Sequence, residues 1–232
     1  MELIENSNKM LVIRMDANES LANALRRTVV EVPVLAIDEV EIYKNDSALY
    51  DEVLAHRLGL IPLKTESNMT EKTSVEFKLT KKGPCTVYSG DLNGSGEVVF
   101  DKIPLTILGD DGKLELVATA KLGKGLDHAK YIPGLCYYRH ILEITSSPKI
   151  DSIIKDSKGL IKAEKKGSKW VCDLLEGEIE DVIIAAGKEA ISNSSEILFV
   201  IESFGNMPAK DILAKTIKAL SANLAEFEKE IK

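Results

Sequence analysis

The sequence predicts an α+β fold in which one domain is split by an insertion. Both ends of the chain combine a strand pattern with an amphipathic helix pattern, over residues 10–32 and 196–231. From Lys64 to about residue 147 the apolar residues instead alternate in short runs separated by turn clusters, without a long helical pattern. Two similar ends around a middle of different character indicate a discontinuous domain with an insert.

The change in pattern gives expected boundaries. We expect the split domain to comprise residues 1–47 and 193–232, as a sheet with two packed helices. A mostly antiparallel, β-rich insert is expected over 48–147. Residues 148–192, which are rich in lysine and glutamate, form a third and smaller part.

The amino-terminal elements follow from periodicity and stop signals. Strands are predicted around Leu3 and over residues 10–15, where alternate residues are apolar. A helix is predicted over 19–32, with Asp16 or Asn18 as the N-cap and Glu19 in the position of a capping box, and Pro33 ends it. A strand over 36–44 and a helix over 49–58, closed by Gly59, complete this part.

The remaining elements are predicted in the same way. Within the insert, alternation indicates strands over 75–79, 114–122 and 135–144, with Gly109–Gly112 as a hairpin loop. A helix over 179–190, a buried strand over 196–201 and a last helix over 207–231 follow, with Pro208 in the first turn of that helix.

The last helix carries a heptad stripe. Its apolar residues are spaced alternately by four and three, which suits packing of one helix on another: Leu213, Ile217, Leu220, Leu224, Phe227 and Ile231. Burial would contribute roughly 1.5–3 kcal/mol for each, whereas a stripe left in water makes a patch that monomers rarely expose. The first half of the stripe can cover the chain's own sheet, and we expect a partner chain to cover the rest.

Composition excludes several classes of protein. The chain has 232 residues, 44% of them hydrophobic, so it can bury a sizeable core. A net charge of −7 argues against direct DNA contact as the main role, and the lysines at 162, 165, 166 and 169 are read as a solvated face or a local patch. No apolar run approaches the roughly 20 residues of a membrane span, so we expect a cytoplasmic protein without membrane contact.

Two stretches resemble one family closely. These are NALRRTVVEVPVLAIDEVEIYKNDSALYDEVLAHRLGLIPL, residues 23–63, and LGKGLDHAKYIPG, residues 122–134. They are similar to the D subunits of archaeal DNA-directed RNA polymerases, in the family of the third-largest subunit of eukaryotic RNA polymerase II and of the amino-terminal domain of the bacterial α subunit. The resemblance implies that the split domain is a dimerisation domain.

It also implies a function. The chain would be a non-catalytic assembly subunit that pairs with the small subunit L. The resulting platform would recruit subunits N and P and the second-largest catalytic subunit, and would reach DNA only through the complex. The nucleotidyltransferase activity and its catalytic metal belong, by resemblance, to the polymerase and its largest subunit, so this chain itself would carry no catalytic residues.

The resemblance and the helical stripes together give candidate residues. On the first and last helices the expected pairing residues are Asn23, Leu25, Arg26, Arg27, Val29, Leu213, Ile217, Leu220, Leu224 and Phe227. Which face of the first helix meets the partner stays open. In the second matching stretch the family implies turn and contact residues, here Gly123, Gly125, His128, Ala129, Lys130 and Pro133.

Metal sites are expected to be absent. Many members of this family carry a ferredoxin-like insert with iron–sulfur clusters, and some carry zinc. A cluster run that began at Cys172 would need cysteines where this chain has Leu175, Glu178 and Val182. Cys85 and Cys136 are isolated, and a single thiolate makes no zinc site. Residues 148–192 are therefore read as a ferredoxin-like remnant without cluster ligands.

Two rival functions stay open. One is an α-like homodimeric scaffold. The other is a stand-alone phosphate-binding enzyme that uses the loop from Gly123 to His128, although this loop lacks the GxxxxGK spacing of a phosphate loop. His56 near Asp51 and the carboxylate pair Asp110–Asp111 lie where such residues are ordinary, on a helix face and in a turn.

Overall fold

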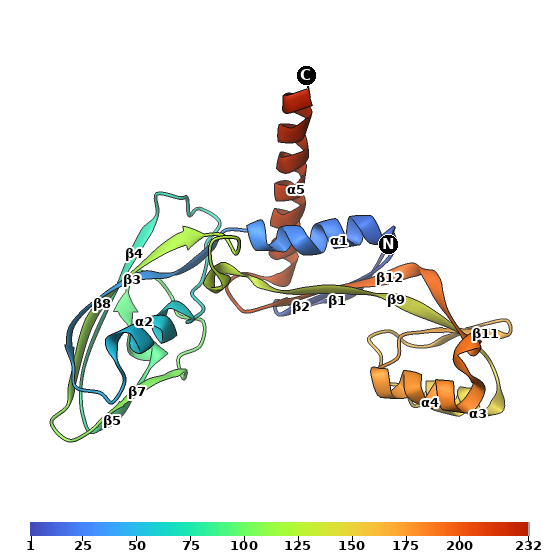
Figure 1. Ribbon diagram of the computed structural model, residues 1–232, viewed down its shortest axis with the longest axis horizontal. Helices are drawn as coiled ribbons and strands as arrows, with labels where there is room; N and C mark the ends of the chain where they lie inside the picture. The colour runs from blue at the N-terminus through green and yellow to red at the C-terminus, as the bar shows by residue number, and fades with distance from the viewer. Residues whose placement is uncertain (232) are drawn as a thin grey trace. The chain divides into compact units, whose positions relative to one another are not determined.

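The computed structural model describes residues 1–231, which fold as two compact units (Figure 1). Unit 1 comprises residues 1–27 and 136–201, and unit 2 comprises 28–135 and the chain from 202 onward. Each unit is therefore built from two separate stretches. An α+β chain with antiparallel strand pairs was predicted and is observed, but the unit boundaries lie at other positions than the domain boundaries expected from the sequence.

Unit 1 is built on the larger sheet, which has six strands within the described residues, in the order β1-β2-β12-β9-β11-β10. These strands are β1 (Glu2–Asn6), β2 (Met10–Asp16), β9 (Gly134–Thr145), β10 (Glu164–Lys166), β11 (Lys169–Cys172) and β12 (Ile191–Ser203). Both β9 and β12 run on into unit 2 at one end. The strands of the 148–192 segment thus extend the sheet that begins at the amino terminus.

The helices of unit 1 are α1 (Glu19–Thr28, its last residue in unit 2), α3 (Pro148–Lys155) and α4 (Glu176–Ala186). The residue pattern did not predict α3, although Ser147 caps it, Pro148 begins it, and Ile150 and Ile154 are buried one turn apart. It placed α4 at 179–190, but a 3-10 turn (η4, Lys188–Ala190) follows Gly187, whose φ of +84° ends the helix.

Unit 2 contains a four-stranded sheet in the part of the chain that is described, in the order β3-β8-β4-β6. The strands are β3 (Val34–Asn45), β8 (Lys113–Gly123), β4 (Ser74–Lys82) and β6 (Asn93–Gly94), and β5 (Cys85–Tyr88) pairs with β7 (Pro104–Leu108) as a separate ribbon. The alternation predicted over 114–122 is β8, in which even-numbered residues from Leu114 to Ala120 are buried. They pack with Phe77, Leu35 and Leu54 in the core of unit 2.

Short helices join the elements of unit 2. They are η1 (Val29–Glu31), α2 (Asp51–Gly59), η2 (Ser89–Asp91) and η3 (Ala129–Tyr131), and the chain reaches α5 (Ala209–Ile231) after β12. The helix predicted over 19–32 is α1 followed by the 3-10 turn η1, because the chain tightens before Pro33. Pro208 precedes α5, and its carbonyl accepts from the amides of Asp211 and Ile212. Within residues 1–231, no helix is both long enough and apolar enough to cross a membrane.

Candidate interaction surfaces

The amino end of α1 is fixed to the sheet of unit 1. Asn18 caps the helix, because its side-chain oxygen accepts from the amide of Ser20 at 2.6 Å. Glu19 does not complete a capping box as expected. Its carboxylate lies 2.7 Å from Nε2 of His140 on β9, whose Nδ1 faces the carbonyl of Ser194 at 3.3 Å. The helix start is therefore held by an ion-pair geometry that the local sequence does not reveal.

The expected pairing residues of α1 differ in exposure. Arg26 and Arg27 are exposed, and Asn23 and Leu25 are half-buried. The Arg26 guanidinium donates to the side-chain oxygen of Asn23 at 2.9 and 3.2 Å, which orients Arg26 along the helix. Val29 is 2% exposed in η1, so its side chain contacts the protein interior and offers little surface to another chain.

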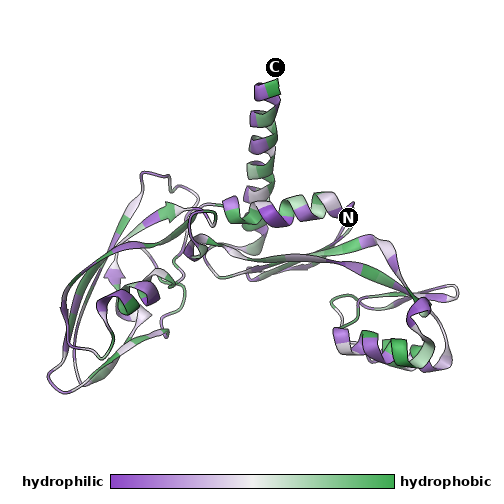
Figure 2. Ribbon diagram, viewed as in Figure 1, coloured by the Kyte–Doolittle hydropathy of each residue, from purple (hydrophilic) through white to green (hydrophobic). Residues whose placement is uncertain are grey.

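The two halves of α5 differ sharply. On the first half Ala209, Ile212 and Thr216 are buried, and Leu213 and Leu220 are half-buried. From Ser221 to Ile231 every residue is exposed, including Leu224 (62%) and Phe227 (65%). Apolar residues nevertheless continue along the whole helix, as the green segments of α5 in Figure 2 show. The second half thus carries an apolar stripe that nothing in the described chain covers.

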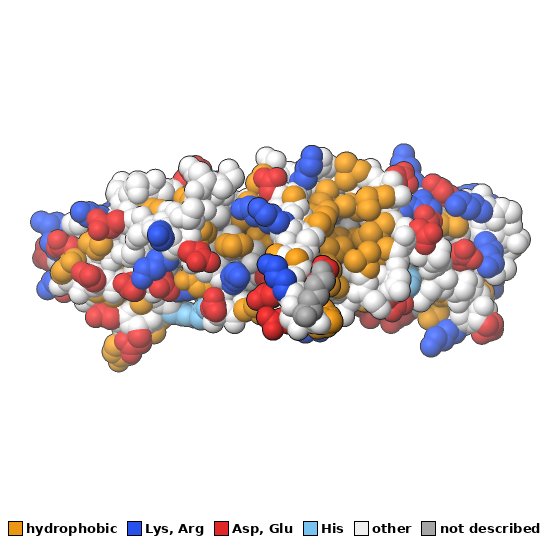
Figure 3. Space-filling view, turned by 90° about the horizontal axis from the view of Figure 1, so that it is seen from above, with side chains coloured by type: hydrophobic (Ala, Val, Ile, Leu, Met, Phe, Trp, Pro, Cys, Tyr) orange, Lys and Arg blue, Asp and Glu red, His pale blue; other side chains and the backbone are white. Residues whose placement is uncertain are grey.

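We define this stripe on α5 as Ile217, Leu220, Leu224, Phe227 and Ile231. Ile217 is 49% exposed and Ile231 is 69% exposed, so four of the five side chains are largely in water. Figure 3 shows hydrophobic side chains, in orange, at the surface seen from above, between charged side chains of both signs. Exposed apolar residues in a regular helical row are typical of a surface that another helix or sheet covers.

The loop from Gly123 to Pro133 is closed on unit 2. A Cβ atom on Gly123 would lie 2.5 Å from the ring of Tyr131, and one on Gly125 would lie 2.8 Å from Ile132. Both glycines are therefore required by close packing. His128 caps η3 by accepting from the amide of Lys130 at 3.1 Å, Ala129 begins η3, and the carbonyl of Pro133 accepts from the amide of Phe204.

Charged and polar groups fasten the same loop to β3. Asp38 accepts from Nζ of Lys130 at 2.9 Å and from the hydroxyl of Tyr131 at 3.0 Å. The hydrogen bond from Lys130 holds the pKa of Asp38 below its usual value, and burial together with the Asp38 carboxylate raises the pKa of Tyr131 to about 12. His128, which the alternative phosphate site would use, and Lys130 are both engaged in contacts that shape the loop, whereas Lys124 is exposed.

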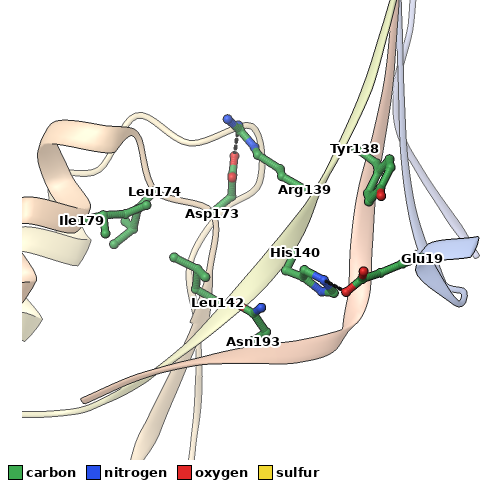
Figure 4. A pocket seen from close by; sticks show the side chains of 9 residues that line it. All are labelled: Glu19, Tyr138, Arg139, His140, Leu142, Asp173, Leu174, Ile179 and Asn193. Carbon is green, nitrogen blue, oxygen red and sulfur yellow. Dashed lines mark hydrogen bonds and ion pairs between the residues drawn. The ribbon is translucent and has the colours of Figure 1, made fainter. Parts of the chain in front are cut away.

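A cavity of about 420 Å³ lies in unit 1 and was not foreseen from the sequence (Figure 4). Its lining consists of Glu19, Tyr138, Arg139, His140, Leu142, Asp173, Leu174, Ile179 and Asn193. Two ion pairs occupy its polar side. Arg139 donates to Asp173 at 2.5 Å, and His140 meets Glu19. Arg139 already faces a carboxylate, and its Nε atom is buried without an acceptor in the described chain.

The three cysteines do not fit a cluster or a zinc site. They lie on three different strands, and Cys172 is packed with Ile144, Trp170 and Val182 in the core of unit 1. Burial raises the pKa of the thiols of Cys136 and Cys172 to about 12, so both are protonated at neutral pH. Among residues 1–231, no three His, Cys, Asp or Glu side chains gather as metal ligands would.

In the segment over residues 148–192, Asp151 of α3 joins neighbouring elements. Its carboxylate accepts from the Ser146 hydroxyl at 2.7 Å, from the Trp170 indole at 2.7 Å and from Lys165 at 2.9 Å. These hydrogen bonds, that from Ser146 foremost, hold the pKa of Asp151 well below its usual value. Lys165 and Lys169 of the lysine run are engaged in ion pairs, with Asp151 and Glu143.

Comparison with known proteins decides the family. The family described as RNA polymerase Rpb3/RpoA insert domain matches residues 40–133. DNA-directed RNA polymerase subunit Rpo3 of Pyrococcus horikoshii is 36% identical over an alignment that covers 91% of this chain and 89% of that protein. The chain belongs to the Rpo3 family of DNA-directed RNA polymerase subunits.

Other archaeal relatives extend this match to nearly the whole chain. Subunit Rpo3 of Methanobrevibacter smithii is 33% identical over 96% of this chain and 94% of its own length. Subunit Rpo3 of Archaeoglobus fulgidus is 33% identical over 99% and 97%. The resemblance stated from two stretches of sequence is thus confirmed at the level of the family. The pairing, turn and metal assignments of individual residues stay predictions.

Proposed function

We propose that this Rpo3-family chain is a non-catalytic assembly subunit of an archaeal-type RNA polymerase, which pairs with the small subunit L through α5 and α1. The exposed stripe on α5 carries this proposal. A surface of this kind is unfavourable in water and becomes favourable when a second chain covers it. The split dimerisation domain expected over residues 1–47 and 193–232 belongs to the same proposal.

Energetics indicate that the stripe does not act alone. Full burial of its four largely exposed side chains would contribute roughly 6–12 kcal/mol in total. The loss of translational and rotational freedom on association costs about 4–15 kcal/mol. The two ranges overlap, so a tight complex needs further contacts, and we assign these to Asn23, Leu25, Arg26 and Arg27 of α1. Arginine offers several donors in a fixed arrangement, which suits carboxylate or carbonyl groups of a partner.

In this proposal the paired subunits form the platform for N, P and the second-largest catalytic subunit in the cytoplasm, and DNA is reached only through the assembled enzyme. The closed loop from Gly123 to Pro133 supports a role as a rigid contact element. His128, Lys130 and Tyr131 are held by internal contacts, while Leu126 is 68% exposed, so the loop can present a fixed surface to a larger subunit.

The pairing is tested by co-expression with and without the small subunit of the same organism, followed by size-exclusion chromatography. We expect poor yield or aggregation of the chain alone, with only a dilute soluble fraction recovered for measurement, and a one-to-one complex together. A stable, soluble homodimer of the chain alone, unaffected by the small subunit, would favour the α-like homodimer. A well-behaved monomer that ignores the small subunit would contradict both.

Two single variants in the stripe and one control variant locate the interface. Leu224→Asp should weaken the complex by at least about a hundredfold, because the interface would bury an unpaired carboxylate. Leu220→Asp should act in the same direction. Lys218→Asp lies on a different side of the helix and introduces the same side chain, so it should change the affinity by less than about threefold. Equal losses in Leu224→Asp and Lys218→Asp would show that charge, not the stripe, governs pairing.

We also propose that this chain carries no catalytic residues, no bound metal and no phosphate site. We expect the purified chain to contain neither iron nor zinc in stoichiometric amount, as measured by elemental analysis after anaerobic purification. We also expect no binding of inorganic phosphate by calorimetry. Phosphate binding that disappears in His128→Ala would support the phosphate-binding enzyme and contradict our reading of the loop from Gly123 to Pro133.

A further inference from the structure

The exposed half of α5 is too short to stay helical and rigid without a further contact. Residues 221–231 extend beyond the packed half, and every one of them is exposed. Isolated helical segments of fewer than about 12–15 residues are marginal in water, because little besides their own backbone hydrogen bonds holds them. A stripe on a fraying helix would have to become ordered when a partner binds, and this ordering reduces affinity.

One side chain of this half reaches back to the body of unit 2. Asn223 donates through its amide nitrogen to both carboxylate oxygens of Glu31, at 2.9 and 3.1 Å. Glu31 is the last residue of η1, the 3-10 turn against which α5 packs. The turn is well anchored, because the neighbouring Val29 and Val32 are 2% and 0% exposed.

The position of Asn223 on the helix explains how it can do this without blocking the stripe. Asn223 follows Thr216 by seven residues and Ile212 by eleven, which places all three on one side of the helix. Ile212 and Thr216 are fully buried on that side. Three stripe residues, Ile217, Leu224 and Ile231, lie on a neighbouring side, whereas Leu220 and Phe227 are one turn before and after Asn223 and lie next to it. The polar contact therefore continues the inward-facing row and leaves most of the apolar row open.

We propose that Glu31 and Asn223 are positioning residues, which fix the direction of the exposed half of α5 in the free chain and so present the stripe as a preformed docking surface. This inference rests on the proposed pairing function. Asn223 touches the carboxylate of its own chain, and it acts on the partner only through the helix that it holds.

The first test needs no partner, because it measures hydrogen exchange of the amides of residues 221–231 in the free full-length chain. Intrinsic helix propensity alone predicts slower exchange in Asn223→Ala, since alanine is the better helix former. The positioning role predicts the opposite, with exchange at least about threefold faster than in the wild-type chain. Unchanged or slower exchange would overturn the proposal.

The second test exchanges the carboxylate of Glu31 and the amide of Asn223 between the two positions. Asn223→Asp should be as damaging as Asn223→Ala, because two carboxylates then face each other. The double variant Glu31→Gln with Asn223→Asp restores an amide donor opposite a carboxylate with the polarity reversed. It should return the exchange to within about twofold of the wild-type rate. Failure of this rescue would show that Asn223 matters for another reason.

The third test measures association with the small polymerase subunit. Asn223→Ala should weaken the complex roughly fivefold, chiefly through a slower association rate, and the double variant should recover it. Ser221→Ala, an exposed change on the same helix, should have no effect. If the wild type binds but Asn223→Ala binds equally well, the positioning role is wrong and the pairing stands. If the wild type binds no partner, the pairing itself is wrong.

Discussion

The loop from Gly123 to Pro133 and the second half of α5 are both made of residues that the sequence marks as unusual, but the structure treats them in opposite ways. The loop is closed: its glycines are required by Tyr131 and Ile132, and its lysine is paired with Asp38. The α5 stripe is open, with Leu224 and Phe227 more than half exposed. The folding of this chain accounts for Gly123, Gly125, His128 and Lys130 of the loop. No contact within the described chain covers the apolar side chains of the stripe, and for that reason the stripe indicates binding of a second chain.

The largest expected effect is a difference in the free energy of unfolding between substitutions in the two halves of α5. Ile212→Ala in the packed half should lower the free energy of unfolding by about 2–4 kcal/mol, because a fully buried side chain leaves a cavity. Leu224→Ala in the exposed half should change it by less than about 0.5 kcal/mol. Urea denaturation of the free chain measures both. A comparable loss in Leu224→Ala would mean that the stripe is covered within the chain.

An intermediate effect is expected in the loop. Gly123→Ala should lower the free energy of unfolding by about 1–3 kcal/mol, because its Cβ would lie 2.5 Å from the ring of Tyr131. Gly109→Ala is the matched control, since its Cβ would meet nothing within 4 Å, and it should be neutral or slightly stabilising. Thermal unfolding of the two variants decides whether the glycine is required by packing or only tolerated.

The smallest effect concerns pH. The pKa of Asp38 is lowered by its hydrogen bond from Lys130, so this contact stabilises the fold above the carboxyl's unfolded pKa, near 4, and is lost as pH falls through the lower folded value. The side chain of Asp38 is 35% exposed, so screening reduces the contribution to a few tenths of a kcal/mol. Lys130→Met should flatten this part of the acid-unfolding profile. An unchanged profile would show that the pair contributes nothing.

Much of the local structure could be predicted from the sequence. Strong alternation gave β3 and β8 to within two residues at each end, and the heptad spacing gave α5. Several features escaped, among them the short strands β5, β7, β10 and β11, and two of them show why. Helix α3 was not predicted, because Ser147 and Pro148 lie in a lysine-rich segment whose composition is typical of a loop. The assignment of Glu19 to a capping box was wrong because its partner, His140, lies 121 residues away, and no local pattern reports such a contact.

The sequence by itself determined the apolar stripe on α5, the lack of a cysteine spacing suited to a cluster, and the two stretches that identify the Rpo3 family, because all three depend on the order of residues along the chain. Only the tertiary structure decided which half of α5 is packed, why Gly123 and Gly125 are glycines, and that Asn223 is hydrogen-bonded to Glu31. Burial and close approach depend on neighbours brought from distant parts of the chain, and periodicity specifies a face of a helix but not what lies against it.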